Sequence, residues 1–297
     1  GGNALTSLNV AGGTATFSAP TIITTGGQTY SADILLGGTA VLTGTTFSFS
    51  GNINSVSTPV ALTVNASGPV SLTGVTGGVS PLASLTVTGS TLTTLTHAIT
   101  TSGDINIAGP INLGAALTSN SGNVSLPDAV TLTDTTAIVA NGAGGITLGL
   151  TGITGPENLS LTSNSAGAKT TVGAMGSGTL NPNGSVSGAD RVVNVVFDSA
   201  GIVQLNGNIF AQSVKFASPA GGAKPPVSPL ATIVAANGDL IISTDGAFDM
   251  EQNQSLSVFN SSLFGGTPTT VGNLSIVSNN HAISIGDLSA AGSITVN

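Results

Sequence analysis

The sequence contains no cysteine and no tryptophan, and only four of its 297 residues are Lys or Arg. Nucleic-acid binding through phosphates needs clustered Lys and Arg side chains, and docking on an anionic membrane needs them too. With a formal net charge of −8 at pH 7, the chain is expected to bind neither nucleic acid nor an anionic membrane. The absence of cysteine is weak evidence about the cellular compartment.

Long hydrophobic runs are also missing. No run of about 18 apolar residues occurs, so no membrane-spanning helix and no membrane insertion are expected. The most apolar run, Arg191–Phe197 (RVVNVVF), has the length of a single strand. Disorder is also excluded, because 40% of the residues are hydrophobic and β-branched residues are abundant.

The clearest positive pattern is in residues 99–126 (ITTSGDINIAGPINLGAALTSNSGNVSL), where apolar residues recur two positions apart in short bursts. This spacing puts each pair of apolar side chains on one face of a strand. The pairs are Ile105 and Ile107, Ile111 and Leu113, and Val124 and Leu126. Gly, Asn, Asp, Ser or Pro separates the bursts, which predicts strands of about three to five residues joined by tight turns.

The same pattern occurs earlier in the chain. A shift of 77 positions superposes residues 22–49 on 99–126, and residues 5–16 on 82–93, without a gap. Apolar bursts recur about every 18–20 residues, so a 77-residue repeat would hold about four turns. Repeats of this kind predict an all-β parallel β-helix, or β-solenoid, in which each turn buries its apolar side chains against the next.

We expect one continuous solenoid over the whole chain. Regular turns are predicted for residues 1–165 and 232–297, and an irregular, loop-bearing section for residues 166–231. Within that section, residues 173–188 (GAMGSGTLNPNGSVSG) are predicted as a long loop or an insertion between turns. Residues 218–229 (SPAGGAKPPVSP) are predicted as a second loop, because their prolines cannot join a central ladder.

Four stretches carry a family resemblance: ALTSLNVAGG, TTGGQTYSADILLGG, GDLIISTDGAFDM and GNLSIVSNNHAISIGDLSAAGSITVN. They resemble the repeats of very large bacterial surface and secreted proteins, the filamentous-haemagglutinin-like adhesins and related β-strand-repeat proteins. The resemblance implies a right-handed parallel β-helix that is exported and serves as an adhesin, a matrix component or a toxin-delivery stalk. The chain starts and ends inside the repeat pattern, so we expect a segment of a longer protein, secreted or at the cell surface.

The densest acidic group is the only candidate for a metal site. Its members are Asp239, Asp245, Asp249 and Glu251. Carboxylates on successive turns can gather around Ca²⁺, but their spacing fits neither the twelve-residue calcium loop nor the GGxGxD repeats of calcium-binding β-rolls. Solvated turn carboxylates are the alternative interpretation, and we expect no cofactor.

Candidate catalytic residues are equally few. The two histidines, His97 and His281, are expected at the surface, because a zinc site needs three or four ligands. A polysaccharide-cleaving site needs a carboxylate pair, for which Asp190 and Asp198 with the neighbouring Arg191 are the local candidates. Asp190 and Arg191 also fit the closing of a loop before a strand, and we expect no enzymatic activity.

Four functional hypotheses follow. The first is a structural fibre or stalk of a bacterial adhesin or biofilm-matrix filament, with self-association end to end or side by side. The second is a glycan-binding or cell-binding adhesin domain that acts through the loops at 168–190 and 217–230. The third is a polysaccharide-cleaving β-helix enzyme. The fourth, ice binding, needs Thr-x-Thr on every turn; the motif occurs, for example at 14–16, 86–88 and 91–93, but it does not recur regularly on every turn.

Overall fold

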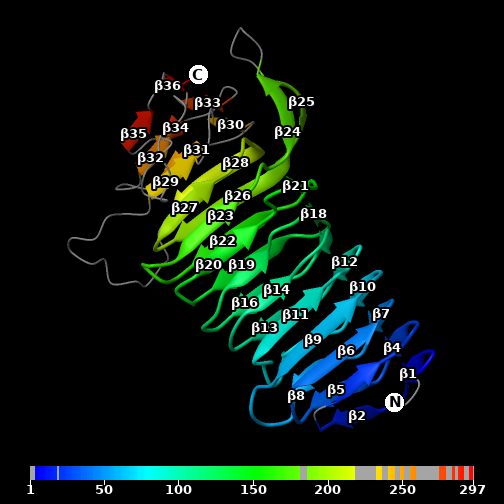
Figure 1. The fold of residues 1–297 in the computed structure, drawn as a ribbon. Coiled ribbons are helices and arrows are strands. Elements are labelled where there is room, and N and C mark those ends of the chain that lie inside the picture. The colour runs from blue at the N-terminus through cyan, green and yellow to red at the C-terminus, as the bar shows by residue number, and fades with distance from the viewer. Residues whose placement is uncertain are drawn as a thin grey trace. The chain divides into compact units, whose positions relative to one another are not determined.

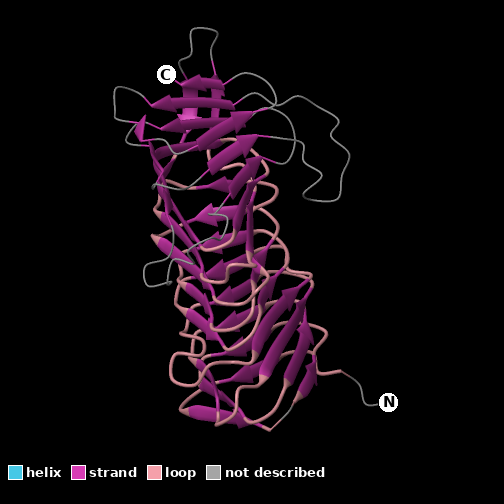
Figure 2. Ribbon diagram, turned by 90° about the vertical axis from the view of Figure 1, so that its left-hand side faces the viewer, coloured by secondary structure: helices cyan, strands magenta, loops and turns pink. Residues whose placement is uncertain are grey.

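The computed structural model describes residues 4–18, 20–180 and 186–217, and beyond them eight strands between residues 232 and 296. The described residues form strands and turns, and nearly all strand pairs are parallel (Figure 1, Figure 2). This confirms the predicted β-solenoid. None of the described residues forms a helix long and apolar enough to cross a membrane. The chain divides into two compact units, residues 1–142 and 143–297. A single continuous solenoid stays a prediction.

The N-terminal unit has three faces, and each turn adds one strand or bridge to each face. Face 1 stacks β1 (Leu8–Val10), β4 (Gln28–Tyr30), β7 (Phe47–Phe49), β10 (Val70–Leu72), β12 (Thr93–Leu95), β15 (Ile111–Leu113) and β18 (Val130–Leu132). Face 2 stacks β2 (Thr14–Phe17), β5 (Asp33–Leu36), β8 (Ile53–Ser55), a bridge at Thr76, β13 (Ile99–Thr101), β16 (Leu117–Ser119) and β19 (Thr136–Ala140). Face 3 stacks β3 (Thr21–Ile23), β6 (Ala40–Gly44), β9 (Ala61–Ala66), β11 (Ser84–Thr88), β14 (Ile105–Ile107) and β17 (Val124–Leu126).

Strand register gives the length of each turn, and the turns are unequal. On face 3, the stretch of chain between Ile105 and its partner Val124 is shorter than the stretch between Thr63 and its partner Thr86. The first interval agrees with the predicted turn length of about 18–20 residues, and the second interval is longer than predicted. Much of the difference lies in residues 73–83 between β10 and β11, where only isolated bridges form, at Thr76 and Leu82.

The 77-residue repeat does not correspond to a whole number of turns. The shift places β1, β4 and β7 of face 1 on β11, β14 and β17 of face 3. It likewise places β3 and β6 of face 3 on β13 and β16 of face 2. With three strand positions per turn, the repeat advances by three and two-thirds turns rather than the predicted four. A copied strand fits the next face because every face requires the same apolar–polar–apolar burst.

The core consists of the alternating inward residues of these strands. Most strands of the N-terminal unit bury their first and third residues and turn the middle one outward. In face 3, Leu62, Leu85, Ile105 and Val124 stack in register, and each is at most 2% exposed. Burying a side chain of this size contributes about 1.5–3 kcal/mol. Each turn thus covers the apolar side chains of its neighbours.

The C-terminal unit repeats the plan with longer turns. One sheet stacks β20 (Gly145–Leu148), β23 (Lys169–Val172), β27 (Ile202–Leu205), β29 (Thr232–Ala235), β32 (Ser255–Val258) and β35 (Asp287–Ala290). A second stacks β22 (Leu159–Ser163), β26 (Val192–Ser199), β28 (Ile209–Ala217), β30 (Leu240–Thr244), β33 (Leu274–Ser278) and β36 (Ile294–Val296). The remaining parallel strands are β21 (Ile153–Thr154), β31 (Phe248–Met250) and β34 (Ile283–Ser284).

One stretch of this unit, predicted as a long loop or an insertion between turns, is an insertion that contains two strands. Between β23 and β26 the chain forms an antiparallel hairpin of β24 (Ser177–Leu180) and β25 (Val186–Asp190). Because the hairpin lies between two paired strands, Lys169 is farther in sequence from its later partner, Ile202, than from its earlier one, Gly145. The other predicted loop, residues 218–229, lies outside the described residues.

Close packing between turns predicts a specific effect of adding one methyl group. Gly89 and Gly12 both have φ in the left-handed region, at 71° and 79°. A Cβ on Gly89 would lie 2.2 Å from the Ala66 carbonyl oxygen of the preceding turn, whereas a Cβ on Gly12 would have no atom within 4 Å. Gly12→Ala should therefore show only the left-handed backbone penalty of about 1–2 kcal/mol, and Gly89→Ala a clearly larger loss. Equal losses of unfolding free energy in urea would contradict this packing.

Candidate binding surface

The predicted metal residues fall mostly outside the described part of the chain. Asp239, Asp245 and Glu251 are among the residues not described, and Asp249 lies in β31, in register with Lys215 of β28. Within the described residues, no three His, Asp or Glu side chains lie close enough together to hold a metal ion. A Ca²⁺ site therefore stays the weaker of the two hypotheses for this acidic group, and solvated turn carboxylates stay the prediction.

His97 lies where the sequence predicts. It is exposed in the turn between β12 and β13, with its Nδ1 atom 3.0 Å from the Thr96 hydroxyl. The other histidine, His281, lies outside the described residues.

The candidate carboxylate pair is not brought together. Asp190 ends β25 and is exposed, whereas Asp198 lies near the far end of the extended strand β26. At about 3.3 Å per residue, β26 separates them by roughly 20 Å, about twice the largest spacing used by glycosidases. Arg191 donates a hydrogen bond of 3.1 Å to the carbonyl of Ala211 and so ties the base of the hairpin to β28.

Aspartates of the N-terminal unit have a structural role in the turns. Asp33 and Asp104 each accept a 2.8 Å hydrogen bond from a backbone N–H one turn later, at Asn52 and Asn123. Asp128 accepts one of 2.7 Å from the Gly109 N–H, one turn earlier. An amide does the same elsewhere, because the Asn52 side chain accepts from the Val75 N–H at 3.0 Å. These carboxylates satisfy turn backbone that the strand ladders leave unpaired.

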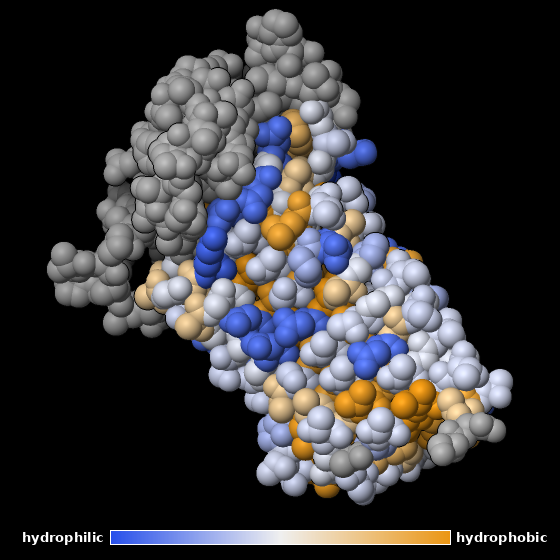
Figure 3. All heavy atoms as spheres, viewed as in Figure 1, coloured by the Kyte–Doolittle hydropathy of each residue, from blue (hydrophilic) through white to orange (hydrophobic). Residues whose placement is uncertain are grey.

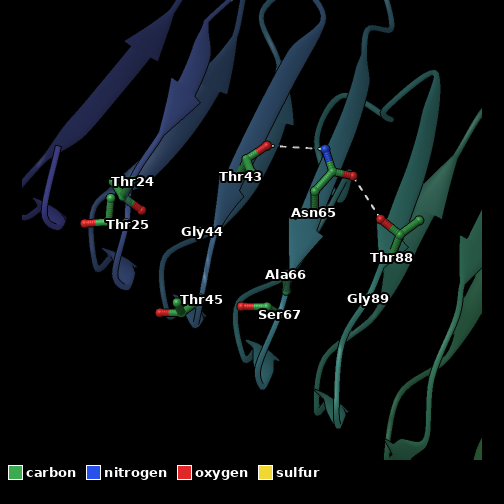
Figure 4. Close-up of a pocket in the computed structure, with 10 residues that line it drawn as sticks. All are labelled: Thr24, Thr25, Thr43, Gly44, Thr45, Asn65, Ala66, Ser67, Thr88 and Gly89. Carbon is green, nitrogen blue, oxygen red and sulfur yellow. Dashed lines mark hydrogen bonds between the residues drawn. The ribbon is translucent and has the colours of Figure 1, made fainter. Parts of the chain in front are cut away.

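A shallow groove crosses the ends of β3, β6, β9 and β11 on face 3 (Figure 4). It holds a volume of about 400 Å³. Its lining is Thr24, Thr25, Thr43, Gly44, Thr45, Asn65, Ala66, Ser67, Thr88 and Gly89. Asn65 is fixed at its centre, donating to the Thr43 hydroxyl at 3.4 Å and accepting from the Thr88 hydroxyl at 2.9 Å. The groove is uncharged and lined with hydroxyl and amide groups.

Face 1 presents a second uncharged surface. The middle residue of each of its seven strands points outward, and these residues are paired in register from strand to strand. In order they are Asn9, Thr29, Ser48, Ser71, Thr94, Asn112 and Thr131. We call these seven residues the face 1 row. On the side of the molecule drawn in Figure 3, weakly polar, pale residues likewise predominate, with separate blue and orange patches between them.

Sequence reasoning missed one buried polar cluster. Tyr30 stacks on Phe49 with ring centroids 4.8 Å apart, and its hydroxyl donates to the Gln28 Oε1 atom. The Gln28 amide donates in turn to the Thr43 carbonyl at 3.0 Å and the Thr24 hydroxyl at 3.2 Å. Burial raises the pKa of Tyr30 above its ordinary value, so this group stays a neutral hydrogen-bond donor. The inward spacing of Gln28 and Tyr30, two residues apart in β4, is the signal that would have found them.

No family model, curated protein or solved structure matches this chain. The groups that its own surfaces expose are therefore what bears on its function. The N-terminal unit exposes mainly hydroxyl, amide and backbone groups, with the large apolar side chains of Leu5, Ile23, Val56 and Val79 also exposed, and its aspartates are engaged in hydrogen bonds to turn backbone.

The structural role of the aspartates is testable at Asp104. Asp104→Asn keeps an oxygen that can accept from the Asn123 N–H, as Asn52 already does for Val75, and should leave the unfolding free energy nearly unchanged. Asp104→Ala leaves that part-buried N–H without its acceptor and should cost about 1–3 kcal/mol. Urea unfolding of both variants is the measurement, and a loss in Asp104→Asn as large as in Asp104→Ala would show that the charge matters.

Proposed function

We propose that this chain is a structural segment of a bacterial extracellular β-solenoid fibre or stalk, part of a surface adhesin or a matrix filament. The observation that carries the proposal is the character of the N-terminal unit. Its outward strand positions hold mainly Thr, Ser and Asn, and its four aspartates accept hydrogen bonds from turn backbone. Such a surface suits a passive scaffold.

The turn architecture supports the same proposal. Each turn pairs its backbone with the turns before and after it, and the stability of such arrays is approximately a sum over neighbouring turns. A solenoid is therefore lengthened by adding turns, without a new fold. The 77-residue repeat is consistent with lengthening by the addition of turns. Equivalent strands of its two copies lie on different faces of the solenoid.

A second candidate, a glycan-binding adhesin domain, is favoured by the groove on face 3. Its hydroxyl and amide lining matches the hydrogen-bonding groups of a neutral sugar chain, and no charged residue lines it. The groove runs across successive strands, which are about 4.8 Å apart. In this proposal sugar rings would lie along the groove, near the fixed amide of Asn65.

Immunogold electron microscopy on intact cells of the bacterium that produces the chain tests the proposed function. Antibodies against the chain should label the outer surface or filaments that extend from it. A matched variant replaces residues 178–189 by Asn-Gly, since Ser177 and Asp190 already pair and a two-residue turn can close them. Because the hairpin is an insertion, the variant should be labelled in the same way.

Label confined to the cell interior would contradict the structural proposal. Surface label that persists in the variant while binding to glycans or other cells disappears would assign the chain to the adhesin alternative, acting through the hairpin. Binding that survives in the variant but is lost in Asn65→Ala would instead place that activity in the groove.

A further inference from the structure

One wall of the groove on face 3 carries hydroxyl groups that have no partner within the described part of the chain. They belong to Thr25, Thr45 and Ser67, which lie on three successive turns. From this wall we infer that the groove binds a neutral polysaccharide chain, laid along the stack of turns, and that these three hydroxyls contact it. The inference deepens the glycan-binding candidate of the proposed function, on which it rests.

The row of hydroxyl residues continues beyond the groove on both sides. Thr6 holds the place of Thr25 on the preceding turn. Ser90 follows the groove residue Gly89, is only 7% exposed, and its hydroxyl has no hydrogen-bond partner among the described residues. A buried hydroxyl without a partner is costly, and a ligand that reaches it supplies the missing bond. The row ends one turn later, at Pro110.

The opposite wall of the groove is held in place. Thr43, Asn65 and Thr88 are bonded to one another there (Figure 4). An amide offers two N–H donors and an oxygen with two acceptor sites, and these two bonds occupy one of each. The Asn65 side chain therefore keeps one N–H and one acceptor site for a ligand. Because its position is already fixed, little conformational entropy is lost on binding.

The lining selects neutral sugars over charged ones. No charged residue lines the groove, and the N-terminal unit that contains it carries four aspartates and no Lys or Arg. An acidic polysaccharide would be repelled by this unit and would find no cation to pair with its carboxylates. Hydroxyl groups both donate and accept hydrogen bonds, as the hydroxyls of a neutral sugar do, so the two surfaces are complementary.

The direction and length of the ligand follow from the floor of the groove. The floor consists of Gly44, Ala66 and Gly89, one small residue from each of three successive strands, so it runs across the strands. Three strands at a spacing of about 4.8 Å span about 10 Å, which suits linked sugars rather than a single ring. A shallow groove with few hydrogen bonds should bind weakly, and many copies in one fibre should strengthen the attachment.

Affinity electrophoresis in native gels tests the inference on the purified chain, whose net charge of −8 makes it migrate. The gels contain dextran, galactomannan or hydroxyethyl cellulose as neutral polysaccharides, or polygalacturonate as an acidic one. At least one neutral polysaccharide should slow the chain, and polygalacturonate should not. Combining Thr25→Val, Thr45→Val and Ser67→Ala removes the three hydroxyls with little change of volume, and should weaken the apparent affinity at least about tenfold.

The matched control removes the same hydroxyl types from the face 1 row, by Thr29→Val, Thr94→Val and Ser71→Ala, and should be slowed like the unchanged chain. No retardation by any neutral polysaccharide, stronger retardation by polygalacturonate, or equal losses in the two triple variants would overturn the inference. Retardation that is kept without the groove hydroxyls but lost without the hairpin residues 178–189 would overturn it too, and would leave the glycan-binding candidate standing. Immunogold labelling of cells is independent of all these results.

Discussion

Hydrogen bonding between successive turns is the constraint on which the structure depends. Strands of three residues have little stability alone, since even an isolated two-stranded hairpin is marginal. Stacked in parallel, each strand pairs with one before and one after it, and inward side chains such as Leu85 and Ile105 are covered from both sides. The fold thus needs only one apolar–polar–apolar burst per face, which a chain poor in charge and aromatic residues can supply many times.

The turns are the second requirement, because some of their N–H groups bond to no backbone carbonyl of an adjacent turn. The chain meets it with carboxylate and amide side chains, as when Asp104 binds the Asn123 N–H and Asn52 binds the Val75 N–H. Hydroxyls contribute too, since the Ser119 Oγ donates to the Gly103 carbonyl at 2.7 Å and accepts from the Gly122 N–H at 2.9 Å. In a sequence, acidic residues are candidates for catalysis or metal binding. In the N-terminal unit the aspartates instead accept hydrogen bonds from turn backbone.

Local features of the fold were predictable from the sequence, and relations between turns were not. The alternation around Ile105 and Val124 predicted strands that the structure contains. The rotation of the 77-residue repeat from face to face was hidden, because all three faces accept the same burst. The face 1 row was hidden for a related reason: turns of unequal length remove any fixed spacing between Ser71, Thr94 and Asn112.

The buried pair of Gln28 and Tyr30 shows a different limit. Alternation identifies which residues point inward, but a glutamine at such a position is accepted only if partners for its amide exist, and these come from Thr24 and Thr43 in neighbouring segments. Polar groups are expensive to bury unpaired, so their partners must be known before burial can be assigned. Sequence patterns without register do not supply them.

Residue-resolved amide hydrogen exchange tests the central claim most directly, namely that backbone pairing from turn to turn includes the turns themselves. The account predicts that the Asn52, Gly109 and Asn123 amides, which are bonded to side chains of adjacent turns, are protected to nearly the same degree as the strand amide of Ile105. Exchange of these three amides at the rate of an unstructured peptide, with Ile105 still protected, would contradict it.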